Sequence, residues 1–506
     1  MQLSGLVPLI EALPGVRRLS KDLDQGSLAA LRGAALGVPE AARAAVVAAL
    51  VRHWQGPVLW VTAGPERARL AHDELGLWTG EPRRVQHFPA PEALFYDRTP
   101  WEPETVRQRV AVLAQLAGVL EEEAAPIIVA PAWALMVRTV PAALLKGGIR
   151  ALKVGQFRPP AELAAAWLRF GYQPVSVVEE PGSFSMRGGI VDVYPPNLPQ
   201  PVRLEFFGDE IDSLRAFDPA TQRSGQALDA VQVVPASEAF MSQGPRAASA
   251  LRQGGWRDLV PAHGQRLERD VERLERGEAF LGMEYYLPYL YPQPATLLDY
   301  VDGQALVIAD DLLAIKAEAQ ALEGQAADLR AELQCERELP VTWPVPYLAW
   351  GELAERLAAK GALSLAYDAA PEELLLAEEE SFQPGLRYGG RMKQALDDVR
   401  RVLEAGGRAV LVSRQTARLR ELLAELNLSV YPREAIIAVP PAGSLTMVQG
   451  SLSEGWALAG ERLAVLTDAE LYGWRRSQPR RQRRARALAP EAFFAVARRN
   501  STERIG

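Results

Sequence analysis

Cysteine and histidine are scarce in this sequence of 506 residues. The single cysteine, Cys335, excludes an internal disulfide bond and favours a reducing, cytoplasmic setting. The four histidines are scattered singly along the chain and have no cysteine partners. Because zinc sites need several such ligands at short spacings, we expect no metal site, and we expect no cofactor.

Long apolar runs are missing as well. No stretch of about 18 consecutive apolar residues occurs, so we expect no membrane-spanning helix and no membrane partner. The first residues lack the basic stretch, apolar core and cleavage site of a signal peptide. The length predicts three or four domains, because one hydrophobic core rarely grows beyond about 250–300 residues.

The charge of the chain is uneven. Its formal net charge is −7, yet residues 475–486 (RRSQPRRQRRAR) hold seven arginines and no acid, which leaves −14 for the rest. A protein whose remaining residues are this acidic is poorly suited to bind a nucleic-acid phosphate backbone over its whole surface. The run could contact nucleic acid, pair with an acidic protein surface, or form a solvated tether; it contains no aromatic residue for base stacking, and we favour the last two interpretations slightly. Its arginines are Arg475, Arg476, Arg480, Arg481, Arg483, Arg484 and Arg486.

The pattern of apolar residues predicts a multidomain α/β protein. In residues 1–138, continuous apolar runs at 56–64 and 126–135 alternate with helical patterns, which is typical of parallel β-α-β units. Residues 139–238 are rich in turns and short strands and predict a small inserted α+β domain. Residues 239–345 return to the first sheet through the strand-like ALVIADD (305–311).

A second α/β unit is expected at 346–473, followed by an arginine-rich linker and terminal helix at 474–506. The strands of this unit are predicted at 406–414, 435–440, 444–450 and 462–468, with a helix at 392–405.

A phosphate-binding loop is not recognisable. No lysine follows a glycine, so the GK[ST] sequence that binds phosphates and magnesium does not occur. Where such a loop would fall, RGAALGVPEAAR (32–43) keeps only Gly33 and Gly37 as turn residues. Asp310 and Asp311 follow an apolar strand, where a motor ATPase places its magnesium-binding and catalytic acids, but without a phosphate loop we interpret them as a solvated strand end. We therefore expect no nucleotide binding and no catalytic residue.

One long segment resembles a known family. Residues 182–238, with RGGIVDVYP, VRLEFFGDEIDSLRAFDPATQRS and VVPASE, resemble the second domain of the repair protein UvrB and, more closely, its counterpart in the transcription-repair coupling factor (Mfd) family. Weaker similarity in the same order extends over most of the chain, including FPAPEALFYDRTPWEPETVRQRVAVLAQL (88–116) and LAVLTDAELYG (463–473).

The resemblance implies a fold and a function. The first domain would be a degenerate P-loop domain of the RecA type, and the inserted domain would bind UvrA. The chain departs from UvrB in three ways: it lacks the ATP-binding lysine, LFYDRTPWEPET (94–105) is too short for the DNA-clamping hairpin, and it continues into a divergent α/β domain. It thus resembles the N-terminal part of Mfd, without the RNA-polymerase-binding and translocase domains through which the full-length family member contacts polymerase and DNA.

The implied role is a non-catalytic module that recruits UvrA to stalled RNA polymerase and autoinhibits the full-length, ATP-dependent translocase. Two alternatives remain: an ATP-dependent DNA-damage-processing protein of the UvrB or helicase class, and a DNA-binding scaffold that acts through the arginine run.

The same resemblance suggests residues for UvrA binding. Arg187 matches one of the basic residues of the UvrA-facing surface, whereas Pro174 and Ser185 stand where UvrB has arginines. Arg187 could instead pair with Glu205 or Asp209 on a neighbouring strand. Further candidates are Arg169, Phe184, Arg203 and Arg215, with a core position favoured for Phe184.

Overall fold

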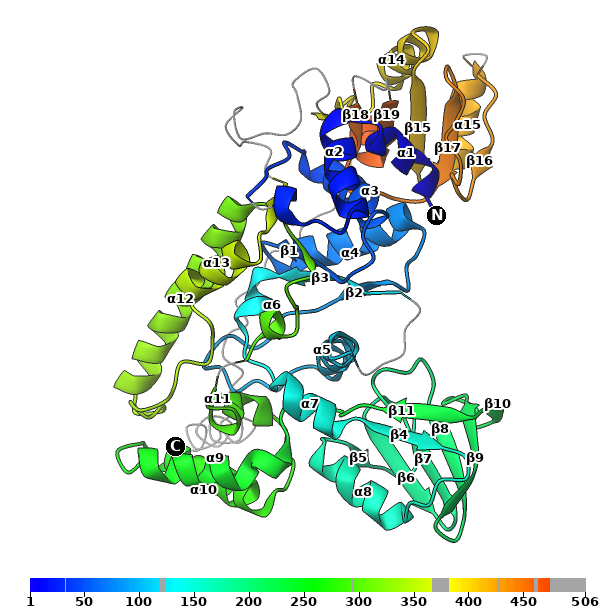
Figure 1. Ribbon diagram of the computed structural model, residues 1–506. Helices are drawn as coiled ribbons and strands as arrows, with labels where there is room; N and C mark the ends of the chain where they lie inside the picture. Colours follow the sequence, from blue (N-terminus) through cyan, green and yellow to red (C-terminus); the bar gives the residue numbers. More distant parts are fainter. Residues whose placement is uncertain are drawn as a thin grey trace, which may run out of the picture.

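The computed structural model shows three lobes joined through a central parallel sheet (Figure 1). The structure describes residues 1–31, 33–118, 124–293, 295–365, 382–425, 428–458 and 463–473. The arginine run at 475–486 and the expected terminal helix lie outside the described residues.

The central sheet has five parallel strands in the order β13-β12-β1-β3-β2. Its strands are β1 (Val58–Thr62), β2 (Val85–His87), β3 (Ile127–Pro131), β12 (Leu306–Ala309) and β13 (Leu363–Ser364). Every residue of β1, β3 and β12 is buried, as the continuous apolar runs predicted. The predicted boundary at residue 346 is wrong, because β13 completes this sheet and is supplied by residues that were assigned to the second α/β unit.

Helices cover both faces of the central sheet. One face packs against the N-terminal helices α1 (Val7–Glu11), α2 (Pro14–Asp24), α3 (Glu40–Val51) and α4 (Pro65–Thr79). The other face packs against α5 (Pro103–Leu116), α6 (Ala132–Met136), α12 (Leu312–Cys335) and α13 (Trp350–Ala359). The helices α9 (Gly244–Gly254), α10 (Pro261–Arg276) and α11 (Leu287–Leu290) extend this second core.

The second α/β unit is a six-stranded sheet in the order β14-β18-β19-β15-β17-β16. Its elements are β14 (Phe382–Pro384), α14 (Met392–Glu404), β15 (Arg408–Ser413), α15 (Thr416–Glu425), β16 (Pro432–Arg433), β17 (Leu445–Gln449), β18 (Trp456–Leu458), β19 (Leu463–Thr467) and α16 (Asp468–Tyr472). Its helices cover one face, whereas the other face shares an apolar core with α1, α3 and α4. The strand predicted at 435–440 is wrong: the N-terminal segment occupies this backbone, since the Gly5 amide donates to the Ile436 carbonyl and the Ile436 amide donates to the Gln2 carbonyl.

The inserted domain is built on a six-stranded sheet in the order β10-β9-β8-β7-β6-β5. Its elements are α7 (Ala142–Gly148), β4 (Arg150–Lys153), α8 (Pro160–Arg169), β5 (Gln173–Pro174), β6 (Ser183–Arg187), β7 (Ile190–Val193), β8 (Val202–Phe207), β9 (Glu210–Phe217), β10 (Ser224–Leu228) and β11 (Ala230–Val233). Helix α8 and the β4–β11 ribbon cover one face of this sheet. Strand β7 pairs with β8 in antiparallel register, and a turn at Gly188 and Gly189 separates β6 from β7, which also pair antiparallel.

The connection between the inserted domain and the central sheet is tied by a buried ion pair. Arg109 of α5 and Glu238 have fully buried side chains, and Arg109 donates from Nε and Nη2 to the two carboxylate oxygens over 2.5 and 3.1 Å. The Thr139 hydroxyl donates to the same carboxylate. Thr139 lies where the chain leaves for the inserted domain and Glu238 where it returns, so the Glu238 carboxylate links the two crossings to each other and to Arg109 of α5. The arrangement fixes the inserted domain at its base.

No helix in the described part of the chain combines the length and the hydropathy that crossing a bilayer requires.

Candidate partner-binding face

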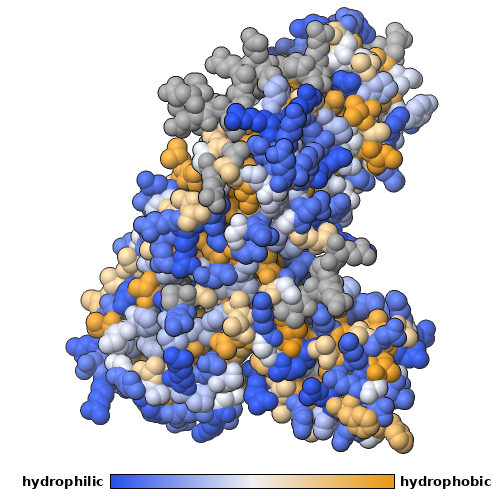
Figure 2. Space-filling view, in the orientation of Figure 1, coloured by the Kyte–Doolittle hydropathy of each residue, from blue (hydrophilic) through white to orange (hydrophobic). Residues whose placement is uncertain are grey.

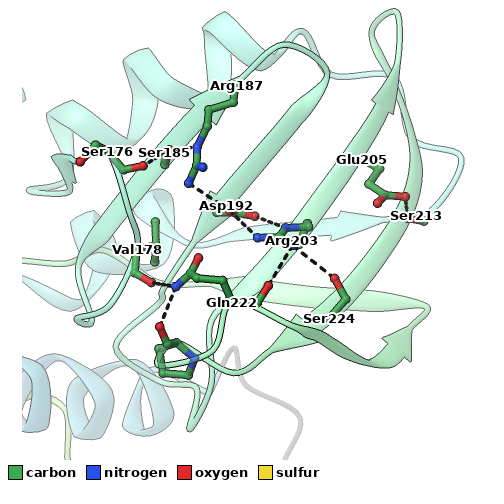
Figure 3. Close-up of polar contacts among 11 residues, drawn as sticks. Ser176, Val178, Ser185, Arg187, Asp192, Arg203, Glu205, Ser213, Gln222 and Ser224 are labelled. Atoms are coloured by element: carbon green, nitrogen blue, oxygen red, sulfur yellow. Dashed lines mark hydrogen bonds and ion pairs between the residues drawn. The ribbon is translucent and has the colours of Figure 1, made fainter.

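The sheet of the inserted domain has a covered face and an open face. Successive side chains of a strand point to opposite faces, so cross-strand pairs separate the two sets. The row Phe184, Val193 and Val202 lies in the core beneath α8. The adjacent row runs from Ser185 through Asp192 and Arg203 to Arg215 and lies on the open face. Figure 3 shows Ser185, Asp192 and Arg203 of this row.

Asp192 and Arg203 form the central ion pair of the open face. Asp192 is 2% exposed, and its two carboxylate oxygens accept from Nε and Nη2 of Arg203 over 2.7 and 2.9 Å. This bidentate geometry matches the guanidinium fork to the carboxylate. The hydrogen bonds to Asp192 raise the pKa of Arg203 above its ordinary value. The charge of Arg203 is therefore neutralised within the domain.

Further contacts hold Arg203 flat against the sheet. Its guanidinium lies 4.7 Å from the ring centroid of Phe217, which is buried. Its Nη1 donates to the Gln222 carbonyl over 3.3 Å and to the Ser224 hydroxyl over 3.4 Å. Figure 3 shows Arg203 of β8 meeting Gln222 of the turn and Ser224 of β10. Arg203 is thus a structural residue of this face and has little freedom to reach a partner.

Arg187 is differently placed, at the end of β6. Its side chain is 57% exposed, and its closest carboxylate oxygen, from Asp192, is 4.0 Å away. Its Nε donates to the Ser185 hydroxyl over 3.3 Å. A pairing with Glu205 or Asp209 is not what the structure shows: the Glu205 carboxylate accepts from the Ser213 hydroxyl over 2.7 Å. Because an exposed pair at 4.0 Å contributes little, the guanidinium of Arg187 remains available to a ligand.

The other predicted residues fall into two groups. Arg215 is exposed on the open face and makes no ion pair within 4.0 Å among the described residues. Arg169 is exposed at the end of α8, which covers the opposite face. Phe184 is 4% exposed and belongs to the core of the domain, the position that the sequence favoured. Arg187, Arg203 and Arg215 therefore share one face, and Arg169 and Phe184 do not.

Asp192 is the residue of this face that sequence reasoning missed. The signal was present, since an acid alternates with Val191 and Val193 in an otherwise apolar strand. Its partner could not be identified, because the pairing depends on the register between β7 and β8.

Side chains of the protein occupy the region where a motor ATPase would bind its nucleotide. Asp310 is 3% exposed, which corrects its interpretation as a solvated strand end. Its carboxylate accepts from Arg43 over 2.9 Å and from Nε and Nη2 of Arg67, both over 2.9 Å. These contacts with Arg67 and Arg43 lower the pKa of the Asp310 carboxyl despite its burial, which acts in the opposite direction. Asp311, in contrast, caps α12 by accepting from the Ala314 amide.

The loop before α3 is extended and does not curl around a ligand. Gly33 has a positive φ of 70° and turns the chain. The following residues run beside β13: the Leu36 amide donates to the Ser364 carbonyl, and the Ser364 amide donates to the Ala34 carbonyl. Gly37 is buried. The Leu36 amide is thus hydrogen-bonded to β13, whereas a phosphate-binding loop would direct such amides to a ligand.

Comparisons with known proteins agree with this architecture. The family model described as UvrB interaction domain matches residues 151–239, which include the open face. The chain is 27% identical over 468 residues to the transcription-repair-coupling factor of Bacillus subtilis, covering 88% of this chain and 39% of that protein. The corresponding proteins of Myxococcus xanthus and Escherichia coli are 29% and 28% identical, covering 89% and 90% of this chain and 40% and 39% of theirs.

The chain is similar to part of the transcription-repair coupling factors. The resemblance expected from the sequence is thereby confirmed. The chain spans about two-fifths of the length of these relatives. We refer to the matched residues 151–239 as the interaction domain.

Proposed function

We propose that this chain is the UvrA-recruiting, non-catalytic part of a transcription-repair coupling factor. The observation that carries the proposal is the exposed guanidinium of Arg187, which extends from the open face of the interaction domain. RNA polymerase and DNA are proposed partners of the complete protein.

Charge alone does not explain recognition by the interaction domain. Residues 151–239 contain seven basic and eleven acidic residues, a net charge of −4. Because the domain as a whole is acidic, contacts between its arginines and carboxylates of a partner must be local. Arg203 is already neutralised by Asp192, whereas Arg187 and Arg215 are exposed cations of the open face.

The central sheet fits a degenerate RecA-like domain that no longer uses ATP. Arg43 and Arg67 pair with Asp310 where a motor protein would hold magnesium and phosphate. A nucleotide would have to displace these buried pairs without a phosphate-binding lysine. An ATP titration with magnesium, followed by calorimetry, is expected to show no saturable binding; saturable binding would instead favour the UvrB or helicase class.

The role in UvrA recruitment is tested by charge reversal at Arg187. We expect the intact chain to bind UvrA, and Arg187→Glu to weaken the affinity at least tenfold, because a local cation becomes an anion. Thermal stability should change little, since the Arg187 side chain is 57% exposed. Arg169→Glu is the matched control, because Arg169 is an exposed arginine at the end of α8, which covers the opposite face of the sheet. Equal affinity of Arg187→Glu and wild type would refute the residue assignment, and no binding by the wild type would refute the proposed function.

Autoinhibition is a second part of the proposal. The matched relatives are about two and a half times as long as the aligned region, so the complete protein has further surface with which to cover the open face. We expect this chain alone to bind UvrA more tightly than the complete protein does. Equal affinities would refute the proposal that the complete protein covers the open face.

A further inference from the structure

Three apolar side chains lie exposed at one end of the interaction domain. Phe157 is 71% exposed, Phe207 is 82% exposed and Ile190 is 39% exposed. Hydrophobic side chains reach the surface at the lower right of Figure 2, over this domain. Isolated apolar side chains on a surface are ordinary, but a contiguous group is typical of an interaction site. We call these three residues the apolar ridge.

Strand register places the apolar ridge on the open face. Glu210 is paired with Phe207 of β8 on one side and with Phe157 on the other, so the two rings flank it on the same face of the sheet. In the neighbouring row, Ile190 lies between Arg187 and Glu205. The amide of Phe206 donates to the Gly189 carbonyl over 2.8 Å, which brings the turn after Arg187 next to the end of β8. The apolar ridge is therefore continuous with the surface around Arg187.

The backbone beneath the ridge is firmly held. The segment that carries Phe157 runs beside the start of β9, where the Arg158 amide donates to the Asp209 carbonyl over 2.7 Å. The Gly155 amide donates to the Ile211 carbonyl over 2.8 Å, and the Ile211 amide donates to the Gln156 carbonyl over 3.0 Å. A partner would thus meet side chains that are already positioned, and little backbone entropy would be lost on binding.

Burial distinguishes these two rings from Phe184 and Phe217 of the same sheet. Phe184 and Phe217 are 4% and 1% exposed, the first in the core and the second beneath the guanidinium of Arg203. Phe157 and Phe207 contribute to neither set, and exposing two aromatic rings to water is unfavourable for the domain in isolation. Their exposure is compatible with a contact that forms only when a partner is bound.

The charges around the ridge exclude simple electrostatic recognition. Glu205, Asp209, Glu210 and Asp212 all belong to β8, β9 or the turn between them. Such an acidic rim repels the partner carboxylate that Arg187 would contact, so this end of the open face favours the same partner through apolar contact. Aromatic side chains at the centre of an interface, next to an arginine, are the usual energetic anchors of protein–protein recognition.

We propose that the apolar ridge is the hydrophobic anchor of the UvrA interface, with Arg187 as the adjacent polar contact. The inference rests on the proposed function and adds a specific second component to it. The partner surface would carry an apolar depression for the two phenyl rings beside a carboxylate for Arg187. The arginine would contribute orientation, and the ridge would contribute most of the affinity that does not depend on salt.

The experiment compares intact-chain variants for binding to immobilised UvrA. We expect Phe157→Ala and Phe207→Ala each to weaken the affinity about tenfold, and the double variant to weaken it more. Phe207→Leu keeps an apolar side chain and should retain most of the affinity. Ile437→Ala is the matched control, since Ile437 is 75% exposed but lies in the second α/β unit, between β16 and β17. Because all these side chains are exposed, the circular dichroism spectrum and melting temperature should remain those of the wild type.

Salt dependence separates the two components. Ridge variants should lower the affinity by the same factor at low and high salt, whereas Arg187→Glu should alter the salt dependence itself. If the double phenylalanine variant binds like the wild type while Arg187→Glu binds weakly, the ridge is refuted and the proposed function stands. If the phenylalanine variants are weak and Arg187→Glu is not, the ridge is supported and the arginine assignment fails. If the wild type does not bind UvrA, both proposals are refuted.

Discussion

Replacing Asp192 with asparagine removes the carboxylate that neutralises the guanidinium of Arg203. Asp192 is 2% exposed and the Arg203 side chain is 18% exposed, so little water can replace the lost acceptor. The asparagine amide would also direct N–H donors toward the guanidinium donors. Removing one partner of a fully buried pair costs about 3–5 kcal/mol, and the partial exposure of Arg203 reduces this to about 2–3 kcal/mol.

Hydrogen exchange of the intact chain is the appropriate measurement, because several domains unfold in one molecule and a single melting temperature would mix them. A loss of about 2–3 kcal/mol predicts a decrease of roughly 30- to 150-fold in the protection of amides in β7 and β8, since each 1.4 kcal/mol is a factor of ten. Amides of the central sheet should keep their protection.

Arg215→Met is the control for this measurement, because it removes an exposed cation of the same face that has no ion pair within 4.0 Å among the described residues. It should change protection by less than threefold, consistent with the usual small effect of surface substitutions. If Asp192→Asn and Arg215→Met behave alike, the Asp192–Arg203 pair does not hold the open face together, and the reasoning fails.

Two other perturbations test the central domain. Asp310→Ala leaves the buried Arg43 and Arg67 without their shared carboxylate, so we expect a loss of about 3–5 kcal/mol and a lower midpoint in urea denaturation; an unchanged midpoint would contradict the arrangement. Burial raises the pKa of Glu284 from 4.5 to about 7. The native state then keeps a proton that the unfolded state releases, so wild-type stability should fall by about 3 kcal/mol between pH 4.5 and 7, while Glu284→Gln should lack this decrease. Urea midpoints at pH 5 and pH 7.5 measure it, and parallel changes in both proteins would exclude Glu284 as the cause.

Local sequence patterns were sufficient to predict the strands that are buried on both faces. The runs that form β1 and β3 are almost entirely apolar, and this pattern is typical of strands in a parallel sheet that helices cover on both faces. Strand β13 was missed because it has only two residues, Leu363 and Ser364, and its position is set by pairing with β12. The run at 435–440 was predicted as a strand from its apolar residues, yet the N-terminal segment occupies its backbone groups.

The candidate face shows the same division. The resemblance singled out Arg187, with Arg203 and Arg215 as further candidates, but the sequence could not show which of these arginines is free, because arginines on strands look alike without a register. The structure distinguishes them through Asp192, which neutralises Arg203 and leaves Arg187 at 4.0 Å. Likewise, Phe207 is exposed whereas its neighbour Phe206 is partly buried against the core, and this difference depends on which face of β8 each ring occupies.

By itself, the sequence determined the apolar strands, the lack of a phosphate-binding lysine and the similarity of the inserted domain to a repair family, since these depend on residue types at short spacings. Only the tertiary structure decided which charges are free. Arg43 and Arg67 meet Asp310 across 267 and 243 residues of sequence. Whether a charged side chain is neutralised or available depends on such distant partners and on the water that the fold excludes.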